Sequence, residues 1–153
     1  MAFKSFRRKK EMAIKMRVLY ESGKKGMAQF ATAVKDKYEL PVNAVDNQIP
    51  PAYSCDRERI VIIAISAKKD VSDAIRRFCG EFKKERAANV ALLVDGDQAV
   101  VDKLSDVISG AGTNLVGTKL ISLGGLGPFG GTLSDDLKAE LLTWVEELVA
   151  SCK

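Results

Sequence analysis

A run of branched apolar residues near the middle of the chain constrains the fold more than any other feature. Residues 59–65 have the sequence RIVIIAI. β-Branched residues favour strands, and a continuous apolar run, unlike an alternating one, is typical of a strand covered on both faces. Strands of that kind occur mainly in parallel sheets with helices on either side. We therefore expect a central strand at this position.

Segments typical of strands and helices alternate along the rest of the chain. Other apolar segments predict four further strands. The first begins near Ile14 and runs through residues 16–20, and the others are at residues 42–45, 89–94 and 115–123. Apolar residues at helical spacing predict four helices, at residues 27–38, 71–86 and 98–109 and from Thr132 or Ser134 to about Val149. This alternation favours the α/β class, with a doubly wound five-stranded parallel sheet and right-handed crossovers.

The length and composition fit one globular domain. The chain has 153 residues, of which 46% are hydrophobic, and a domain of this length buries about 70% of the surface that the unfolded chain exposes. Its three cysteines match no zinc or CxxC pattern, so we expect reduced thiols in an intracellular compartment. The sequence has no histidine, which excludes Ser-His and Cys-His catalysis and histidine-ligated metal sites within this chain.

Positive charge is concentrated at the N-terminus. The net charge is +4, but residues 1–15 hold six basic side chains and one acidic one, so residues 16–153 carry 18 basic and 19 acidic side chains. We therefore divide the chain into a basic N-terminal extension, residues 1–15, and a domain, residues 16–153. The extension includes two phenylalanines and could contact acidic lipids or nucleic acid, but we favour simple solvation. Lysine and arginine interrupt the only candidate signal peptide, so we expect a cytoplasmic protein.

The turn after the first strand is similar to one in a known family. Residues 18–27 are VLYESGKKGM, in which a serine and glycines directly follow a strand. With this turn, the five strand–helix units over about residues 16–150 resemble the flavodoxin-like family. The resemblance implies the strand order 2-1-3-4-5, FMN as cofactor, and electron transfer between partner redox proteins. It also implies that the FMN phosphate is held by Ser22, Gly23, Lys24, Lys25 and Gly26.

This turn departs from the family pattern, Ser/Thr-x-Thr-Gly-x-Thr, because lysines stand where the later hydroxyls are expected. A second lysine pair follows the central strand, in Ser66-Ala67-Lys68-Lys69. In a 2-1-3-4-5 sheet both turns lie where the strand order reverses, which is where ligands bind in such folds. Helix N-termini there also attract anions. We predict an anion site at this edge, with solvent-exposed surface lysines as the alternative.

Two carboxylates follow the fourth strand, in Asp95-Gly96-Asp97. They are predicted at the same edge, where they could bind a flavin N–H, a sugar hydroxyl or Mg²⁺. The alternative for Asp97 is a helix N-cap. The turn Gly124 to Gly131 lacks the GxGxxG spacing of a dinucleotide site and is expected to shape the edge or to admit a partner.

Aromatic residues that would cover a flavin are missing from the expected places. Flavodoxin-like proteins commonly place Trp or Tyr in the loops after the third and fourth strands, and residues 66–70 and 95–98 contain neither. Trp144 falls on the inner stripe of the last helix, which leaves Phe129 and Tyr53 as candidates. An alternative function is therefore a flavin-free binding or regulatory module that recognises a phosphorylated small molecule or an acidic partner. A hydrolase ranks third, because no nucleophile–base pair is visible.

Overall fold

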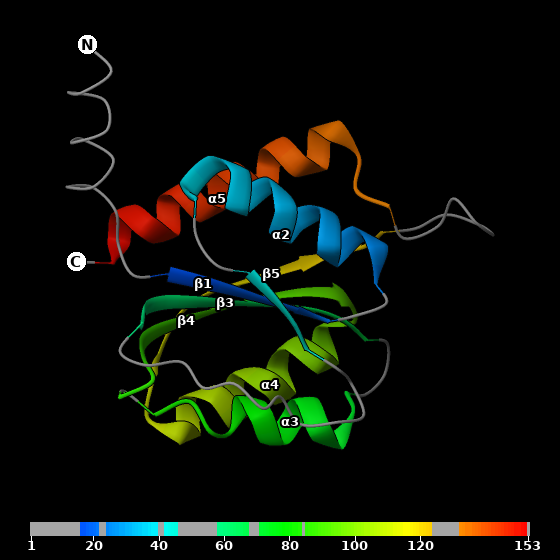
Figure 1. The fold of residues 1–153 in the computed structure, drawn as a ribbon. Helices are drawn as coiled ribbons and strands as arrows, with labels where there is room; N and C mark the ends of the chain where they lie inside the picture. The colour runs from blue at the N-terminus through cyan, green and yellow to red at the C-terminus, as the bar shows by residue number, and fades with distance from the viewer. Residues whose placement is uncertain are drawn as a thin grey trace, which may run out of the picture.

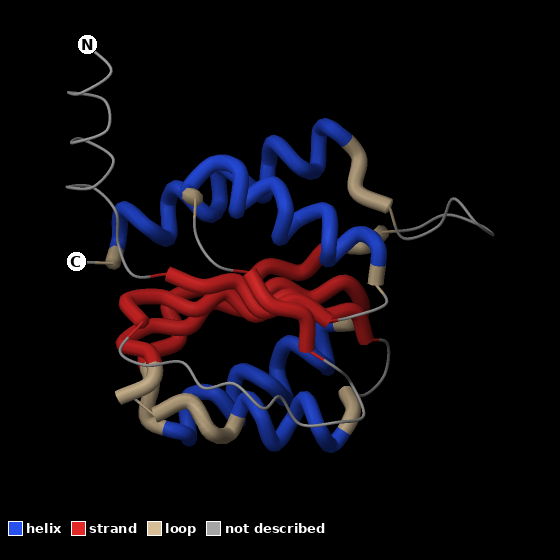
Figure 2. Tube along the Cα trace, in the orientation of Figure 1, coloured by secondary structure: helices blue, strands red, loops and turns tan. Residues whose placement is uncertain are grey.

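The protein folds into a central sheet with helices on both faces (Figures 1 and 2). The structure is a computed structural model, and it describes residues 16–21, 24–39, 42–45, 58–67, 71–83, 85–123 and 132–152. The strands are β1 (Met16–Glu21), β2 (Val42–Val45), β3 (Glu58–Ala67), β4 (Ala87–Gly96) and β5 (Asn114–Ile121). The helices are α2 (Lys25–Tyr38), α3 (Asp73–Cys79), α4 (Gln98–Ala111) and α5 (Asp135–Ser151). The predicted α/β class is confirmed.

The sheet has the strand order β2-β1-β3-β4-β5, and each neighbouring pair is parallel. Strand β1 pairs with β3 through Tyr20 and Ala64, and β3 pairs with β4 through Ser66 and Asp95. All strands therefore end on one side of the sheet, called here the carboxyl edge. The chain reverses its direction of progress between β1 and β3, because β2 lies on one side of β1 and β3 on the other.

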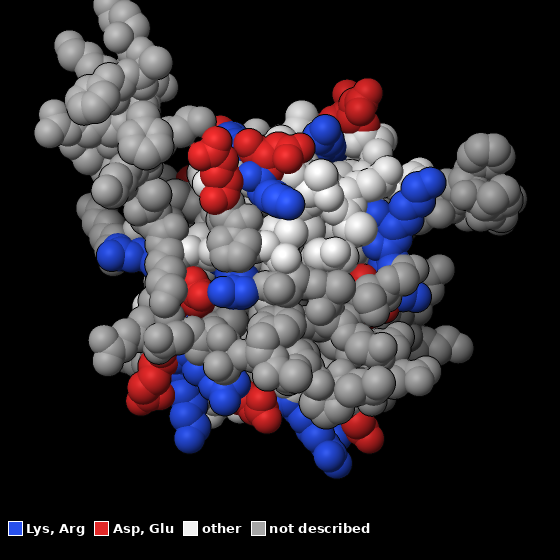
Figure 3. Space-filling view, viewed as in Figure 1, with Lys and Arg blue, Asp and Glu red and all other residues white. Residues whose placement is uncertain are grey.

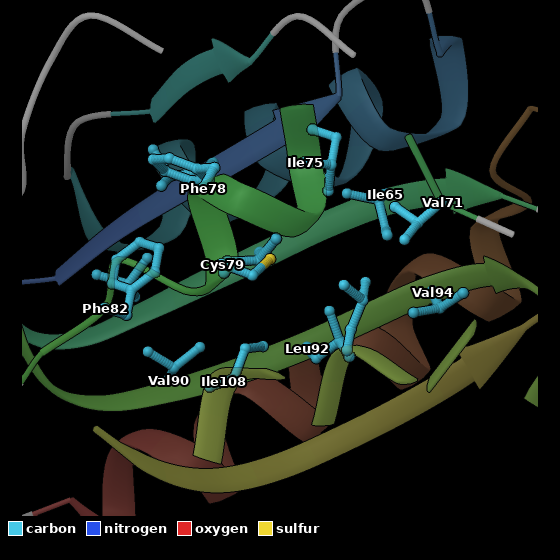
Figure 4. Close-up of a cluster of buried hydrophobic side chains, with 14 of the residues drawn as sticks. Ile65, Val71, Ile75, Phe78, Cys79, Phe82, Val90, Leu92, Val94 and Ile108 are labelled. Carbon is cyan, nitrogen blue, oxygen red and sulfur yellow. The ribbon is translucent and has the colours of Figure 1, made fainter. Parts of the chain in front are cut away.

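The central strand contributes to both hydrophobic cores. Helices α2 and α5 cover one face of the sheet, and α3 and α4 cover the other (Figure 1). Ile60, Ile62 and Ala64 belong to the core under α2 and α5, and the residues between them belong to the core over α3 and α4. All residues from Ile60 to Ile65 are fully buried. This confirms that residues 60–65 form a strand covered on both faces. Figure 4 shows the core between the sheet and helices α3 and α4, to which Ile65 and Leu92 of the sheet and Ile75 and Phe78 of α3 contribute.

Helix α3 is shorter than its apolar pattern predicts. We expected a helix over residues 71–86, but α3 ends at Cys79, and Gly80 is its C-cap. Phe82 lies beyond the helix and still packs edge-on against Phe78, with ring centroids 5.1 Å apart. The predicted C-terminal end of this helix was therefore wrong, because a residue in a following turn can pack into the same core without being helical.

Polar side chains and one glycine fix the other helix ends. Ser72 accepts a hydrogen bond from the backbone N–H of Ile75, and Ser134 accepts one from Leu137. Ser72 is thus the N-cap of α3, and Ser134, rather than Thr132, is the N-cap of α5. Gly112 ends α4 in the left-handed conformation, with φ of 111°, which glycine adopts without steric cost. None of the described helices has the length and apolar character needed to cross a membrane.

Candidate functional site

The candidate site lies at the carboxyl edge, where β1, β3 and β4 end next to one another. Helix α2 begins there, with Lys24 as its N-cap residue and with Lys25 and buried Gly26 in its first turn. The side chain of the N-cap residue makes no capping hydrogen bond, and the first turn of the helix contains no acidic residue. A helix start of this kind favours a negatively charged group, because its first N–H groups have no partner within the helix and the helix dipole is positive there.

Glu21, the last residue of β1, is a buried carboxylate beside this helix start. It is 3% exposed, and its Oε2 lies 3.8 Å from the Nζ of Lys24. Burial raises the pKa of Glu21, and the charge of Asp95 adds to the increase, whereas Lys24 and a hydrogen bond from the backbone N–H of Ser66 oppose it. Part of the positive charge of Lys24 is therefore matched within the protein.

Asp95 joins three parts of the carboxyl edge. Its Oδ2 accepts a hydrogen bond of 2.8 Å from the hydroxyl of Ser66, and its Oδ1 accepts one of 2.9 Å from the backbone N–H of Leu123. The carboxylate thus connects the ends of β3 and β4 with the segment that follows β5. Both oxygens already have a donor within the chain, so the first role of Asp95 is to hold this edge together. Asp97 occupies the N-cap position of α4 without a side-chain cap hydrogen bond.

Gly96 allows the ends of β3 and β4 to approach closely. A Cβ atom at this position would lie 1.8 Å from the carbonyl oxygen of Ala67. No side chain fits into that space, because nonbonded heavy atoms do not come so close. Gly96 is therefore a structural requirement of the pairing between Ser66-Ala67 and Asp95-Gly96.

The structure places part of the predicted site at the carboxyl edge. The predicted residues described there are Lys24, Lys25, Gly26, Ser66, Asp95 and Gly96. The other predicted residues, which lie outside the described part of the chain, are Ser22, Gly23, Lys68, Lys69, Tyr53, Phe129 and the turn Gly124 to Gly131. The basic N-terminal extension lies outside it as well. Trp144 packs, partly buried, against the core under α2 and α5. The sequence reasoning missed Glu21, although an acidic residue at the end of an otherwise apolar strand was a visible signal.

A shallow groove lies next to this edge, between α2 and the start of α5. It has a volume of about 380 Å³, and both acidic and basic side chains line it, among them Lys25, Asp36, Asp135 and Lys138. Figure 3 shows acidic and basic side chains on this side of the molecule, with basic ones where α2 begins in Figure 1. The groove lies along the helices and not across the strand ends. Mixed charge gives it no preference for an anion, in contrast to the start of α2.

Metal ligation has no support among the described residues. No group of three or more histidine, cysteine or carboxylate side chains in that part of the chain is close enough to hold a metal ion. The chemistry that the described carboxyl edge offers is therefore recognition of an anion by the helix start and lysines, next to one buried carboxylate.

Comparison with known proteins identifies the fold. Neither protein-family models nor curated protein sequences gave a match. Among solved structures, the chain is similar to a short-chain flavodoxin associated with a non-canonical PDU bacterial microcompartment, with a TM-score of 0.64 and 12% sequence identity. The similarity covers 92% of this chain and 99% of that one. The chain therefore has a flavodoxin-like fold.

Proposed function

We propose that this protein binds FMN at the carboxyl edge and transfers electrons between redox partners. The observation that carries the proposal is the uncapped start of α2, with Lys24 and Lys25, at the place where the strand order reverses. Ligands of open α/β sheets bind at such places, and helix starts of this kind bind phosphate. FMN, when bound, supplies the electron-transfer chemistry, and the protein supplies binding and orientation.

The described residues fit the phosphate end of FMN. The first turn of α2 has no acidic side chain, and Lys25 is exposed beside it. The charge of Glu21 opposes an anion, but Lys24, whose Nζ lies 3.8 Å from the Oε2 of Glu21, partly offsets that charge. Ser66 and Asp95 hold the ends of β3 and β4 in place beside the start of α2. This chain would thus bind the phosphate through backbone N–H groups and lysine, with fewer hydroxyls than flavodoxins generally use.

A titration of the purified protein with FMN and with riboflavin tests the proposal, because riboflavin lacks the phosphate. We expect FMN to bind more tightly than riboflavin. Lys25→Ala should weaken FMN binding by about twofold to fivefold, as expected for one charge at a helix start, and should leave riboflavin binding unchanged. Lys83→Ala is the matched control, because Lys83 is an exposed lysine just before β4, at the opposite end of that strand.

The same experiment can contradict the proposal. A protein that binds no FMN at any accessible concentration would exclude the flavin function. A holoprotein that loses its FMN whenever it is reduced and reoxidised would exclude electron transfer.

The second candidate is the flavin-free binding module for a phosphorylated small molecule or an acidic partner. The specific observation in its favour is the absence of aromatic residues from residues 66–70 and 95–98, which include the ends of β3 and β4 and the residues after them. A site that lacks aromatic residues to stack on a flavin ring can still bind the phosphate group of another ligand. This candidate predicts that pyrophosphate binds to the colourless protein, that FMN binds no more tightly than pyrophosphate, and that Lys25→Ala weakens both.

A further inference from the structure

We propose that Glu21 takes up a proton when an anion binds at the start of α2, so that this residue sets the charge preference of the site. The inference rests on the phosphate site proposed above and adds a residue that regulates it. It starts from the position of Glu21 at the end of β1, three residues before the N-cap of α2.

The carboxylate of Glu21 has unused hydrogen-bonding capacity. Its side chain is 4% exposed, and its Oε2 has no hydrogen-bond partner within the described part of the chain. The 3.8 Å between this oxygen and the Nζ of Lys24 is too long for a hydrogen bond, so the contact is an attraction between charges only. A buried carboxylate oxygen without a donor is costly when ionised, and a proton placed on it removes the charge.

The groups that act on Glu21 come from three neighbouring parts of the fold. From β3, the backbone N–H of Ser66 donates a hydrogen bond to the carboxylate, and from β4 the charge of Asp95 repels it. From the turn before α2, Lys24 attracts it. Lys24 is the positively charged group among these described neighbours, so its charge stabilises the ionised form of Glu21.

An anion at the start of α2 would compete for that cation. Lys24 is the N-cap residue, and its side chain is 44% exposed, so its ammonium group can turn toward a ligand at the helix start. Glu21 would then lose its cation and face a second negative charge nearby. Both changes favour the neutral acid, which forms when Oε2 accepts one proton from the solvent. Anion binding and proton uptake are therefore coupled.

Carbon-13 NMR of the Glu21 carboxyl group, measured over a pH titration with and without sulfate, tests the coupling directly. Sulfate is the probe because it keeps its double charge throughout the titration, and sodium chloride at equal ionic strength corrects for screening. We expect sulfate to raise the titration midpoint of Glu21 by about one pH unit, which corresponds to a tenfold change in affinity between the two protonation states. The carboxyl group of Glu147, exposed on α5, is the internal control and should not change. An unchanged midpoint of Glu21 at saturating sulfate would overturn the inference.

Glu21→Gln gives an independent test with a residue of the same size. Sulfate affinity of the unaltered protein should fall as pH rises, whereas that of the variant should stay constant and be about tenfold higher at about pH 8. Equal affinities and equal pH dependence in both proteins would overturn the inference.

The matching FMN titration separates this inference from the proposed function. If sulfate raises the titration midpoint of Glu21 but FMN does not bind, only the flavin function is excluded. If FMN binds with the same proton uptake in the unaltered protein and in Glu21→Gln, only the role of Glu21 is excluded.

Discussion

The hydroxyl of Ser66 donates a hydrogen bond of 2.8 Å to the carboxylate of Asp95, and this bond joins the ends of the neighbouring strands β3 and β4. The other oxygen of the carboxylate accepts a hydrogen bond from the backbone N–H of Leu123. One side chain thus keeps three parts of the carboxyl edge together. Because the start of α2 lies at the same edge, the geometry of the candidate site depends on this small network.

Replacing Asp95 by alanine removes the acceptor for both donors. Hydrogen bonds to charged groups contribute about 1.5–3 kcal/mol each, and the donors left behind are partly buried, so we expect the variant to lose about 2–4 kcal/mol of unfolding free energy. Urea unfolding followed by circular dichroism measures this loss. Asp106→Ala on the exposed side of α4 is the control and should change stability by less than about 0.5 kcal/mol. Equal stability of the two variants would contradict the structural role of Asp95.

The layers of the fold could be predicted from sequence because they depend on where apolar residues lie. The run from Ile60 to Ile65 is apolar at every position, and only a strand covered on both faces buries all of it. The end of α3 could not be predicted in this way, because Phe82 contributes to the same core from outside the helix. Periodicity shows which residues are buried but does not show where the helical hydrogen bonds stop.

The candidate site was harder to predict, because its chemistry depends on partners distant in sequence. Asp95 was identified as a possible ligand, but the donor to its Oδ1 is the N–H of Leu123, 28 positions away. Lys24 was identified as a cation for a ligand, and the structure gives it a buried neighbour, Glu21. The sequence showed which residue types lie at this edge. Only the fold showed which groups already pair with the charge of Lys24 and with the lone pairs of Asp95.

Gly96→Ala should damage the carboxyl edge severely. The added Cβ would lie 1.8 Å from the carbonyl oxygen of Ala67, which is backbone and cannot move without breaking the pairing of β3 with β4. We expect a loss of about 3 kcal/mol or more, measured by thermal and urea unfolding. Gly110→Ala is the matched control, because nothing lies within 4 Å of a Cβ there and the residue is helical. That variant should gain about 0.5–1 kcal/mol. A Gly96 variant as stable as the unaltered protein would show that the two strand ends do not meet as described.

Cys79 should resist alkylation in the native protein. Burial raises the pKa of its thiol to about 12, so at about pH 8 roughly one molecule in ten thousand carries the reactive thiolate. Treatment with iodoacetamide, followed by mass spectrometry of the peptide that contains Cys79, should find almost no modification until urea unfolds the chain. The same peptide in urea serves as the positive control. Equally fast modification in the native state would mean that the core between α3 and the sheet opens readily.

The raised pKa of Glu21 predicts how stability depends on pH. Burial makes the ionised form less favourable in the folded state, so between the ordinary value of 4.5 and the raised value the folded protein binds more protons than the unfolded chain. Stability due to this group is therefore fully present below the ordinary value and falls as pH rises through that window. Glu21→Gln removes this dependence, so its stability relative to the unaltered protein should increase with pH across the window. Urea unfolding at several pH values measures the difference. Glu147→Gln on α5 is the control for the substitution itself, because that side chain is exposed. A constant difference for Glu21→Gln would show that the carboxylate is as well solvated in the folded protein as in the unfolded chain.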